Sequence, residues 1–193
     1  MGSEQLAHSD AIHFHSVPQR FTAGAWVALE DVDADSGPLT VYPGSHRLPI
    51  FDFHDLALPT GFASYRNYER FVADLLEAEK LQPEPLLLRR GQAVIWAANL
   101  HHGGSEIADP KRTRLSQANH YFFEGGLYYQ PGASDPFAGR MKLKDIEEVD
   151  TGRRIPNLYR GQPVSQSQLC ARRTWRQWLR AVAGRLGVRR SRA

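Results

Sequence analysis

The segment from Phe21 to Asp31 constrains the fold more strongly than any other part of the sequence. In a β-strand successive side chains point to opposite faces, and here the side chains on both faces are largely apolar or small. A strand with this pattern needs cover on each face, because apolar side chains exposed on either one would meet water. We therefore expect this strand to be covered on both sides.

Short strands and turns surround this segment, and a single helix interrupts them. Ser64 can cap a helix that runs to about Leu81, in which apolar residues recur every three or four positions until Pro83 stops the pattern. Further strands are predicted at 39–42, 86–88, 93–99 and 112–123, with turn residues between them. This order predicts a mainly β protein, a β-barrel or jelly-roll-like sandwich with helical additions.

The composition is that of a globular protein from a reducing compartment. The hydrophobic fraction is 41% and the aromatic fraction 10%, which excludes a disordered chain. Cys170 is the single cysteine, so no internal disulfide can form. The first ten residues lack the apolar core of a signal peptide, and no run of about 18 apolar residues is present to span a membrane. We therefore expect a cytoplasmic protein.

Charge divides the chain into two parts. Residues 1–150 carry 13 Lys and Arg against 21 Asp and Glu, a net charge of −8, whereas residues 151–193 carry 11 Arg and no acid, a net charge of +11. We expect residues 1–150 to form the β domain. Residues 151–193 are predicted to be an Arg-rich extension with a basic amphipathic helix at about 174–187.

The predicted C-terminal helix has more than one possible role. Trp175 and Trp178 recur at helical spacing among many arginines, a composition shared by interfacial membrane helices and by nucleic-acid contacts. The simpler interpretation is that both tryptophans dock on the barrel while the arginines face solvent or the acidic body. We favour this interpretation, keep an acidic partner or a membrane surface as the alternative, and do not expect binding of nucleic acid.

Two distant segments encode a candidate metal site. His8-Ser9-Asp10 stands near the start of the chain, and His101-His102-Gly103-Gly104 ends the strand predicted at 93–99. Two histidines and one carboxylate that leave open positions are the ligand set of non-haem Fe(II) oxygenases. A His-x-Asp sequence alone occurs often by chance. The prediction that His8, Asp10 and His102 bind one metal ion therefore depends on the downstream partners as much as on the motif.

The strand predicted at 112–123 carries a candidate anion site. Alternation places Arg114, Ser116 and His120 on one face of this strand. The guanidinium offers a planar fork of donors and the serine hydroxyl adds another, so Arg114 and Ser116 can bind one carboxylate. A buried arginine without an anion would be costly. A dicarboxylate that chelates the metal at one end and meets Arg114 at the other would satisfy it.

In order and spacing, these segments resemble the phytanoyl-CoA dioxygenase-type family of Fe(II)/2-oxoglutarate-dependent oxygenases. The resemblance covers roughly residues 4–124. It implies a double-stranded β-helix, a jelly-roll fold of the cupin type. The matching segments are His8-Ser9-Asp10, Ala25-Trp26-Val27-Ala28-Leu29-Glu30-Asp31, Gly37-Pro38-Leu39, Tyr42-Pro43-Gly44-Ser45-His46, Gly91-Gln92-Ala93-Val94, Leu100-His101-His102-Gly103-Gly104-Ser105 and Arg114-Leu115-Ser116.

The resemblance implies which residues bind the cofactors. His8, Asp10 and His102 would be the ligands of Fe(II). Trp26 occupies the position at which the family uses a tryptophan to line the site of the co-substrate, 2-oxoglutarate. O₂ would be the second co-substrate.

The same resemblance implies an anchor for the distal carboxylate of 2-oxoglutarate. Arg114, with Ser116 beside it, would take this role, and Arg112 competes for it. The family places a histidine or similar residue six positions after its arginine, and His120 stands six positions after Arg114. This spacing favours Arg114.

The implied activity is hydroxylation of a small molecule, with oxidative decarboxylation of 2-oxoglutarate to succinate and CO₂. Related halogenases replace the carboxylate ligand with a small residue to admit halide, so an intact Asp10 favours hydroxylation. One alternative is a non-catalytic or truncated metal-binding barrel that acts as a binding or assembly module. Another is a cupin-like metalloenzyme of a different reaction class, such as an isomerase.

Three histidines are candidates for contact with substrate. His13 follows the His-x-Asp motif in a predicted loop or irregular strand, His46 ends the Pro-Gly-Ser-His turn, and His120 points inward by alternation. Each also has a purely structural interpretation, as a solvated loop residue, as part of a turn that shapes the barrel mouth, or as a core histidine.

The N-terminal segment is short for this family. Only seven residues precede His8, where the family usually has a substantial segment that includes a core strand. We therefore expect the N-terminal part of the fold to be missing, with almost nothing upstream of His8 to build a strand behind it.

Overall fold

The computed structural model describes residues 4–169. Within this range the protein is mainly β, and most of its strands are short. The strands are β1 (Gln5–His8), β2 (His15–Val17), β3 (Thr22–Ala28), β4 (Leu39–Val41), β5 (Glu84–Leu86), β6 (Ala93–Ala97), β7 (His102–Gly104), β8 (Ser116–Phe122), β9 (Leu127–Tyr129), β10 (Ile146–Glu147), β11 (Arg154–Ile155), β12 (Asn157–Tyr159) and β13 (Gln162–Val164). The helices are α1 (Tyr65–Ala78) and α2 (Gln166–Leu169), with five short 3-10 turns between strands.

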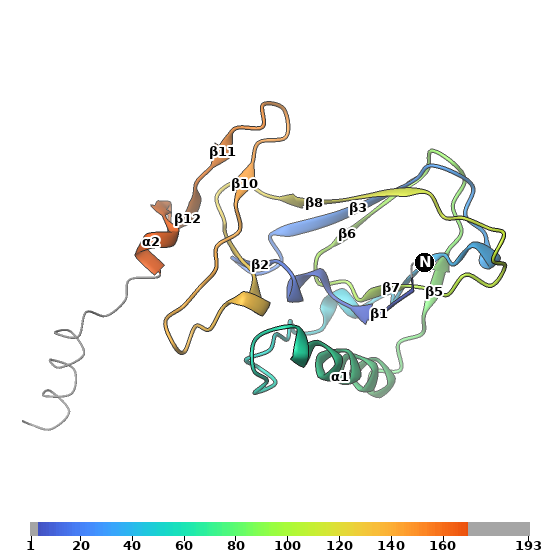
Figure 1. Cartoon of the computed structure of the whole chain (residues 1–193), viewed down its shortest axis with the longest axis horizontal. Helices are drawn as coiled ribbons and strands as arrows, with labels where there is room; N and C mark the ends of the chain where they lie inside the picture. Colours follow the sequence, from blue (N-terminus) through green and yellow to red (C-terminus); the bar gives the residue numbers. More distant parts are fainter. Residues whose placement is uncertain (1–3, 170–193) are drawn as a thin grey trace, which may run out of the picture.

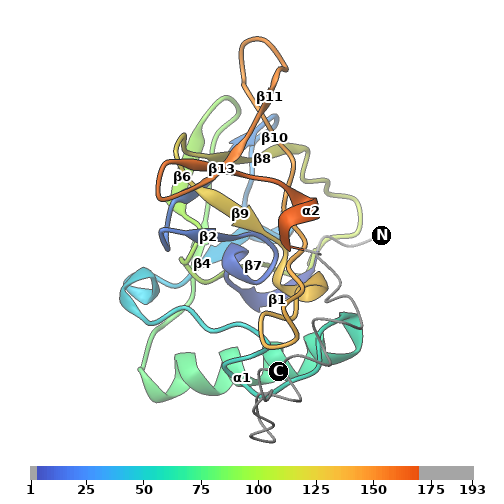
Figure 2. The same cartoon turned by 90° about the vertical axis from the view of Figure 1, so that its left-hand side faces the viewer.

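Two antiparallel sheets form the body of the jelly roll. One has the strand order β6-β3-β8 and the other the order β1-β7-β4-β5. In both views the second sheet lies between the first sheet and helix α1, which covers its outer side (Figures 1 and 2). The pair β2-β9 lies at one end of the two sheets. Consecutive strands of each sheet are far apart in sequence, as expected for a double-stranded β-helix rather than a meander.

The predicted strand at 21–31 is β3, which lies at the centre of its sheet, but only one of its faces is fully covered. The inward face, which includes Trp26 and Ala28, is buried against the other sheet in a cluster with Leu39 and Trp96. The outward side chains of β3 are only half-buried, and Ile95 beside them on β6 is 74% exposed. The expectation of cover on both sides is therefore wrong for the outer face within the described residues.

The segment that ends at His8 forms a short strand that the sequence did not predict, while the absence of an N-terminal part of the fold stays a prediction. Strand β1 pairs antiparallel with β7, and the register places Gln5 opposite Gly104 and His8 opposite His102, with an irregularity between the two pairs. Four residues are too few to show a β pattern in sequence, because the backbone of β7 supplies the partner. The metal-ligand candidate His8 is thus held in the sheet by main-chain hydrogen bonds.

Helix α1 supplies the core on the outer side of this sheet. Tyr68, Val72 and Leu76 are buried along one stripe, in a cluster with Ile12 and Phe53. The helix ends at Ala78 rather than near Leu81, because Lys80 adopts a left-handed backbone conformation with φ of 54°. The apolar periodicity of residues 65–78 therefore predicted the helix and most of its buried face.

The region after residue 123 contains more strand than its loop-rich sequence indicates. β9 joins β2, while β10-β11 and β12-β13 form two small hairpins. The hairpin β10-β11 straddles position 150, so the division into domains at this position stays a prediction. The helix predicted at 174–187 lies outside the described residues. Among the described residues, neither helix combines the length and apolar character needed to cross a bilayer.

Candidate metal centre

His8 and His102 face each other across neighbouring strands. They are directly paired in the register of β1 and β7, and their ring centroids lie 4.6 Å apart. The strands approach closely because Gly103 has no side chain: a Cβ there would lie 2.5 Å from the carbonyl oxygen of Gln5. The His-His-Gly-Gly sequence thus combines a ligand with the small residue that lets β1 come close to it.

Asp10 completes a three-residue cluster that could hold a metal ion. It begins a 3-10 turn directly after β1, and the cluster of His8, Asp10 and His102 is buried. One ligand atom from each residue lies within 4.8 Å of the other two, and Nε2 of His102 is 3.5 Å from Oδ1 of Asp10. Ligands bound to one ion at about 2.1 Å lie roughly 3–4 Å apart, so small side-chain rotations would close the site.

The orientation of both imidazoles suits metal binding. Nδ1 of His8 lies 3.0 Å from the carbonyl oxygen of Leu6, and Nδ1 of His102 lies 3.0 Å from that of Leu100. A carbonyl only accepts, so each Nδ1 carries the proton and each Nε2 keeps its lone pair. This second contact fixes the tautomer and the ring orientation, as in most metal-binding histidines.

The electrostatics favour the forms that bind a cation. Burial, reinforced by the neighbouring His102, lowers the pKa of the His8 imidazole to about 4, so this ring is neutral at pH 7. Burial alone would raise the pKa of the Asp10 carboxyl. The hydrogen bond from His120 and the electrostatic influence of His102 and His120 outweigh it, and the pKa of Asp10 falls to about 2. A neutral imidazole and an ionised carboxylate are the forms required of metal ligands.

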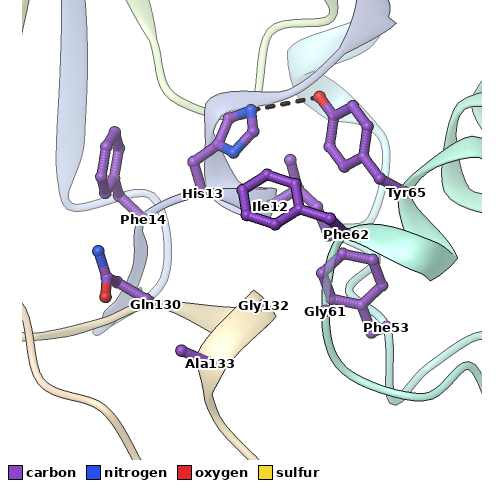
Figure 3. Close-up of a pocket in the computed structure, with 10 residues that line it drawn as sticks. All are labelled: Ile12, His13, Phe14, Phe53, Gly61, Phe62, Tyr65, Gln130, Gly132 and Ala133. Carbon is purple, nitrogen blue, oxygen red and sulfur yellow. Dashed lines mark hydrogen bonds between the residues drawn. The ribbon is translucent and has the colours of Figure 1, made fainter.

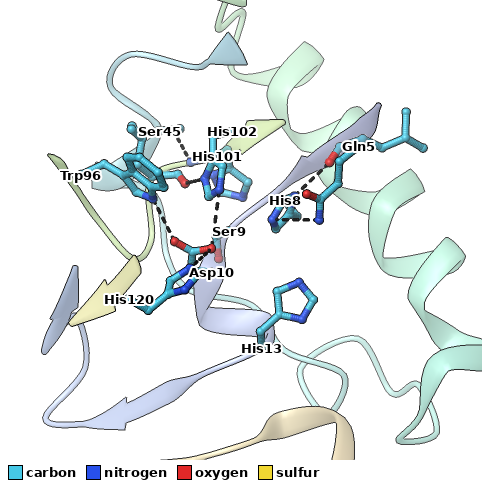
Figure 4. A network of polar contacts seen from close by, with 12 residues as sticks. Gln5, His8, Ser9, Asp10, His13, Ser45, Trp96, His101, His102 and His120 are labelled. Carbon is cyan, nitrogen blue, oxygen red and sulfur yellow. Dashed lines mark hydrogen bonds and ion pairs between the residues drawn. The ribbon is translucent and has the colours of Figure 1, made fainter. Parts of the chain in front are cut away.

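Two further side chains hold the Asp10 carboxylate (Figure 4). Nε1 of Trp96 donates to Oδ2 of Asp10 at 2.9 Å. Nε2 of His120 lies 3.2 Å from Oδ1 of the same carboxylate, and its side chain is 33% exposed. His120 therefore points inward, as the alternation of β8 predicts, and contacts a candidate metal ligand rather than only core side chains.

Main-chain contacts fix the two segments that carry the ligands. The hydroxyl of Tyr68 on α1 accepts a hydrogen bond of 3.3 Å from the amide of Ser9, between the two upstream ligand candidates. Oγ of Ser45 accepts from the amide of His101 at 2.9 Å, and the amide of Tyr42 donates to the carbonyl of His101 at 3.0 Å. The Pro-Gly-Ser-His turn thus positions the strand that carries His102.

His46 and His101 are placed differently from His102. The side chain of His46 is exposed at the outside of its turn, where its backbone carbonyl accepts from the side-chain amide of Asn99. Its role toward substrate stays a prediction. His101 is buried, and burial lowers the pKa of its imidazole to about 4.

Arg114 and Arg112 have different environments. Arg114 lies just before β8 and is half-buried, with Nη1 donating to the carbonyl oxygen of Gly37. Arg112 is on the surface, where it forms an ion pair with Asp33. A partly desolvated guanidinium gains more from a carboxylate than an exposed, already paired one. These environments favour Arg114 over Arg112 as the anchor of an acid, and this role stays a prediction.

Trp26 and Ser116 lie on the same inward face as His120. Trp26 is paired in register with Ala118 on β8, and Ser116 with Ala28 on β3. Trp26 is buried between the sheets, and Ser116 is half-buried. The expected co-substrate residues therefore share one face of the β6-β3-β8 sheet, while their contact with a co-substrate stays a prediction.

His13, which the sequence made a candidate for contact with substrate, comes close to the ligand cluster; its role toward substrate stays a prediction. Its ring centroid lies 5.4 Å from that of His8, and Nε2 is 3.2 Å from the hydroxyl of Tyr65. Sequence reasoning missed Trp96, Tyr68 and Ser45 as supports of the site. No pattern in the sequence predicts the contact of Trp96, because β6 ends at Ala97 and His102 begins β7 in the other sheet, so the two residues do not share one strand as expected.

Comparison with known sequences identifies the family of this chain. The sequence model of phytanoyl-CoA dioxygenase (PhyH) matches residues 1–114. This is more than half of the 193-residue chain, and the chain therefore belongs to the PhyH family. A comparison with the sequences of curated proteins found no match.

Solved structures that are similar to this chain include the enzymes SnoN and SnoK. The epimerase SnoN, in complex with Fe³⁺, alpha ketoglutarate and nogalamycin RO, is 25% identical with a TM-score of 0.50, and the match covers 85% of this chain and 55% of SnoN. The non-heme alpha ketoglutarate-dependent carbocyclase SnoK from nogalamycin biosynthesis is 23% identical with a TM-score of 0.56, covering 76% of this chain and 54% of SnoK. The chain thus spans about half the length of the structures it matches, and the likeness to SnoK supports the jelly-roll fold.

Proposed function

We propose that this protein is a non-haem Fe(II)/2-oxoglutarate-dependent oxygenase that hydroxylates a small molecule. The observation that carries the proposal is the convergence of His8, Asp10 and His102, from two strands and the turn after the first, in one buried cluster. The overall reaction consumes substrate, 2-oxoglutarate and O₂. It yields the hydroxylated product, succinate and CO₂, with one oxygen atom of O₂ in each of the product and succinate.

Membership of the PhyH family and the likeness to SnoN support the proposed cofactors. SnoN was solved with Fe³⁺ and alpha ketoglutarate, which is another name for 2-oxoglutarate. Two imidazole nitrogens and one carboxylate oxygen are the donors that non-haem Fe(II) sites use. The donor set of the described residues therefore fits the metal that the family implies.

Each residue of the site has a proposed task. His8, Asp10 and His102 hold Fe(II), while Trp96 and His120 orient the Asp10 carboxylate. Fe(II) with bound 2-oxoglutarate would supply the oxidising chemistry by activating O₂. The protein contributes ligand geometry, co-substrate orientation and a site shielded from bulk water.

The co-substrate is proposed to lie along the inward face of the β6-β3-β8 sheet. Arg114 and Ser116 would bind its distal carboxylate, and Trp26 would line the space between them and the metal. The carboxylate ligand Asp10 supports hydroxylation over halogenation, because it fills the position that a halide would need. SnoN is an epimerase, so the proposal of hydroxylation rests on Asp10 and not on the likeness to SnoN.

The proposal is tested with Fe(II), 2-oxoglutarate, ascorbate and O₂. We expect a visible charge-transfer absorption when Fe(II) and 2-oxoglutarate are added anaerobically, and formation of succinate when O₂ is admitted. Asp10→Ala is the matched variant, which should lose both signals while keeping the circular dichroism of the wild type. A folded wild-type chain that binds metal but gives neither signal would instead be a metal-binding module, and the proposed activity would be wrong.

A further inference from the structure

A cavity of about 340 Å³ opens between the turn that follows Asp10, the start of helix α1 and the segment after β9. It is lined mainly by apolar atoms, and three phenylalanine rings contribute to its walls: Phe14, Phe53 and Phe62 (Figure 3). Ligand pockets in proteins are about 300–1,000 Å³ in volume and mostly apolar, with a few polar groups that fix orientation. This cavity has the size and the lining of such a pocket.

The cavity adjoins the candidate metal centre through two of its walls. The ring of His13 lies 5.4 Å from the ring of His8, centroid to centroid. The ring of Phe14 lies 5.2 Å from that of His120, which contacts Asp10. A molecule in the cavity would therefore lie next to the side chains that surround the proposed metal ion, as a substrate must.

Few polar groups line the cavity. Nε2 of His13 and the hydroxyl of Tyr65 form a hydrogen-bonded pair of 3.2 Å, and Gln130 adds an amide on the other side. Burial raises the pKa of the Tyr65 hydroxyl, so this group is uncharged at pH 7. Among the described residues that line the cavity there is no aspartate, glutamate, lysine or arginine, so the walls themselves offer no permanent ion partner, and burying an ion against them would be costly.

We propose that this cavity is the substrate pocket and that its substrate is an uncharged molecule with a fused-ring, largely apolar body and a hydroxyl or carbonyl that bonds to the His13–Tyr65 pair. The inference rests on the proposed function and specifies its substrate class. Flat rings would stack among Phe14, Phe53 and Phe62, while a charged or phosphorylated molecule would find no ion partner among the residues that line the cavity. Phe62, which is 94% exposed, forms the outer lip of the cavity.

The test uses two probes of equal size and different charge. 9-Phenanthrol is a neutral three-ring compound with one hydroxyl, and phenanthrene-9-carboxylate is its anionic counterpart. Equilibrium dialysis against the full-length chain should show that the neutral probe binds at least about tenfold more tightly, since an unpaired buried charge is costly. Lys144, whose Nζ lies 5.2 Å from the centroid of the Phe14 ring, would favour the anionic probe, so tighter binding of the neutral probe is a strict test. Equal or tighter binding of the carboxylate would overturn the proposed substrate class.

Two variants locate the binding site. A Cβ at Gly132 would meet only the Phe53 ring edge at 3.6 Å, so the fold has room for a side chain there, and Gly132→Leu would fill part of the cavity. We expect it to weaken 9-phenanthrol binding at least about tenfold, because the lost space excludes a ring. Tyr65→Phe removes only the hydroxyl and should weaken binding about 2- to 12-fold. Unchanged affinity in Gly132→Leu, with wild-type circular dichroism, would place the probe elsewhere and refute the proposal.

Succinate formation without added substrate separates this inference from the proposed function. Gly132→Leu does not contact the metal ligands, so its iron affinity should stay at the wild-type value. If 9-phenanthrol binds as expected but no succinate forms, the pocket stands and the oxygenase assignment fails. If succinate forms but the neutral probe does not bind, or binds equally to Gly132→Leu, the oxygenase assignment stands and the substrate class fails.

Discussion

The indole of Trp96 donates a hydrogen bond of 2.9 Å to Oδ2 of Asp10, and both residues are buried. Oδ1 of the same carboxylate is left facing His102 and His120. The indole has room because its cross-strand partner on β3 is Gly24: a Cβ there would lie 2.5 Å from Cε2 of Trp96. The β6-β3-β8 sheet therefore orients the carboxylate of Asp10, which follows strand β1 of the other sheet.

Replacement of Trp96 by phenylalanine should weaken iron binding without unfolding the protein. Trp96→Phe keeps a ring in the core and removes the only N–H of the side chain, so Asp10 loses a donor that fixes its rotamer. Loss of such a supporting contact typically costs about 10- to 100-fold in metal affinity. Titration calorimetry with Fe(II) under nitrogen measures it. Trp26→Phe is the control, because it changes a buried tryptophan of the same sheet, and equal losses in both variants would refute the role of Trp96.

Gly103→Ala should separate β1 from β7. The new methyl group would lie 2.5 Å from the backbone oxygen of Gln5, and a backbone atom of a paired strand cannot rotate away. We expect a stability loss of about 1–3 kcal/mol and weaker iron binding, since β1 carries His8. Urea denaturation and iron titration measure the two effects. Gly132→Ala serves as the control because its Cβ would make an ordinary contact of 3.6 Å, and equal behaviour of the two variants would contradict the prediction.

Arg114→Ala should weaken the binding of 2-oxoglutarate, whereas Arg112→Ala should not. Arg114 is half-buried, and Arg112 already pairs with Asp33 at the surface. Loss of hydrogen bonds to a charged group costs about 1.5–3 kcal/mol, which corresponds to about a 10- to 100-fold loss of affinity. The charge-transfer absorption of the Fe(II)-loaded protein, titrated with 2-oxoglutarate, gives the affinity. A loss confined to Arg112→Ala would transfer the anchor role to Arg112.

The sequence predicted those parts of the fold in which periodicity extends over several residues. The alternation of residues 21–31 and 112–123 identified β3 and β8, and the helical stripe of Tyr68, Val72 and Leu76 identified α1. β1 and the strands from β9 to β13 were not predicted, because two to four residues show no period and their partners come from elsewhere in the chain.

The candidate site was likewise predicted only in part from the sequence. Residue type and order brought together His8, Asp10 and His102, and alternation gave His120 its inward position. The contact of Trp96 with Asp10 depends on how the two sheets face each other, which no single segment encodes. The same holds for the outer face of β3, because whether a second layer covers it is a property of the whole molecule.

Iron should raise the thermal stability of the wild-type chain and have no effect on Asp10→Ala. An ion that binds only the folded state stabilises it by about 2.7 kcal/mol when its free concentration is 100 times the dissociation constant. Calorimetric scans with Fe(II) and with a chelator measure the shift. His54→Gln is the matched control, because His54 contacts the carbonyl of Ser134 and not the ligand cluster. The same shift in Asp10→Ala as in the wild type would place the ion at another site.

Acid should destabilise the protein in part through His15. Burial lowers the pKa of His15 below its ordinary value of 6.5, and its ring lies 5.2 Å from that of Tyr129, centroid to centroid. The unfolded chain therefore binds a proton more readily than the folded one, so stability is complete above about pH 6.5 and falls as the pH drops below it. His15→Phe keeps an aromatic contact and removes the titration. Its urea midpoint should fall less than that of the wild type between about pH 7.5 and about pH 5.5, and an equal fall in both would show that His15 does not contribute.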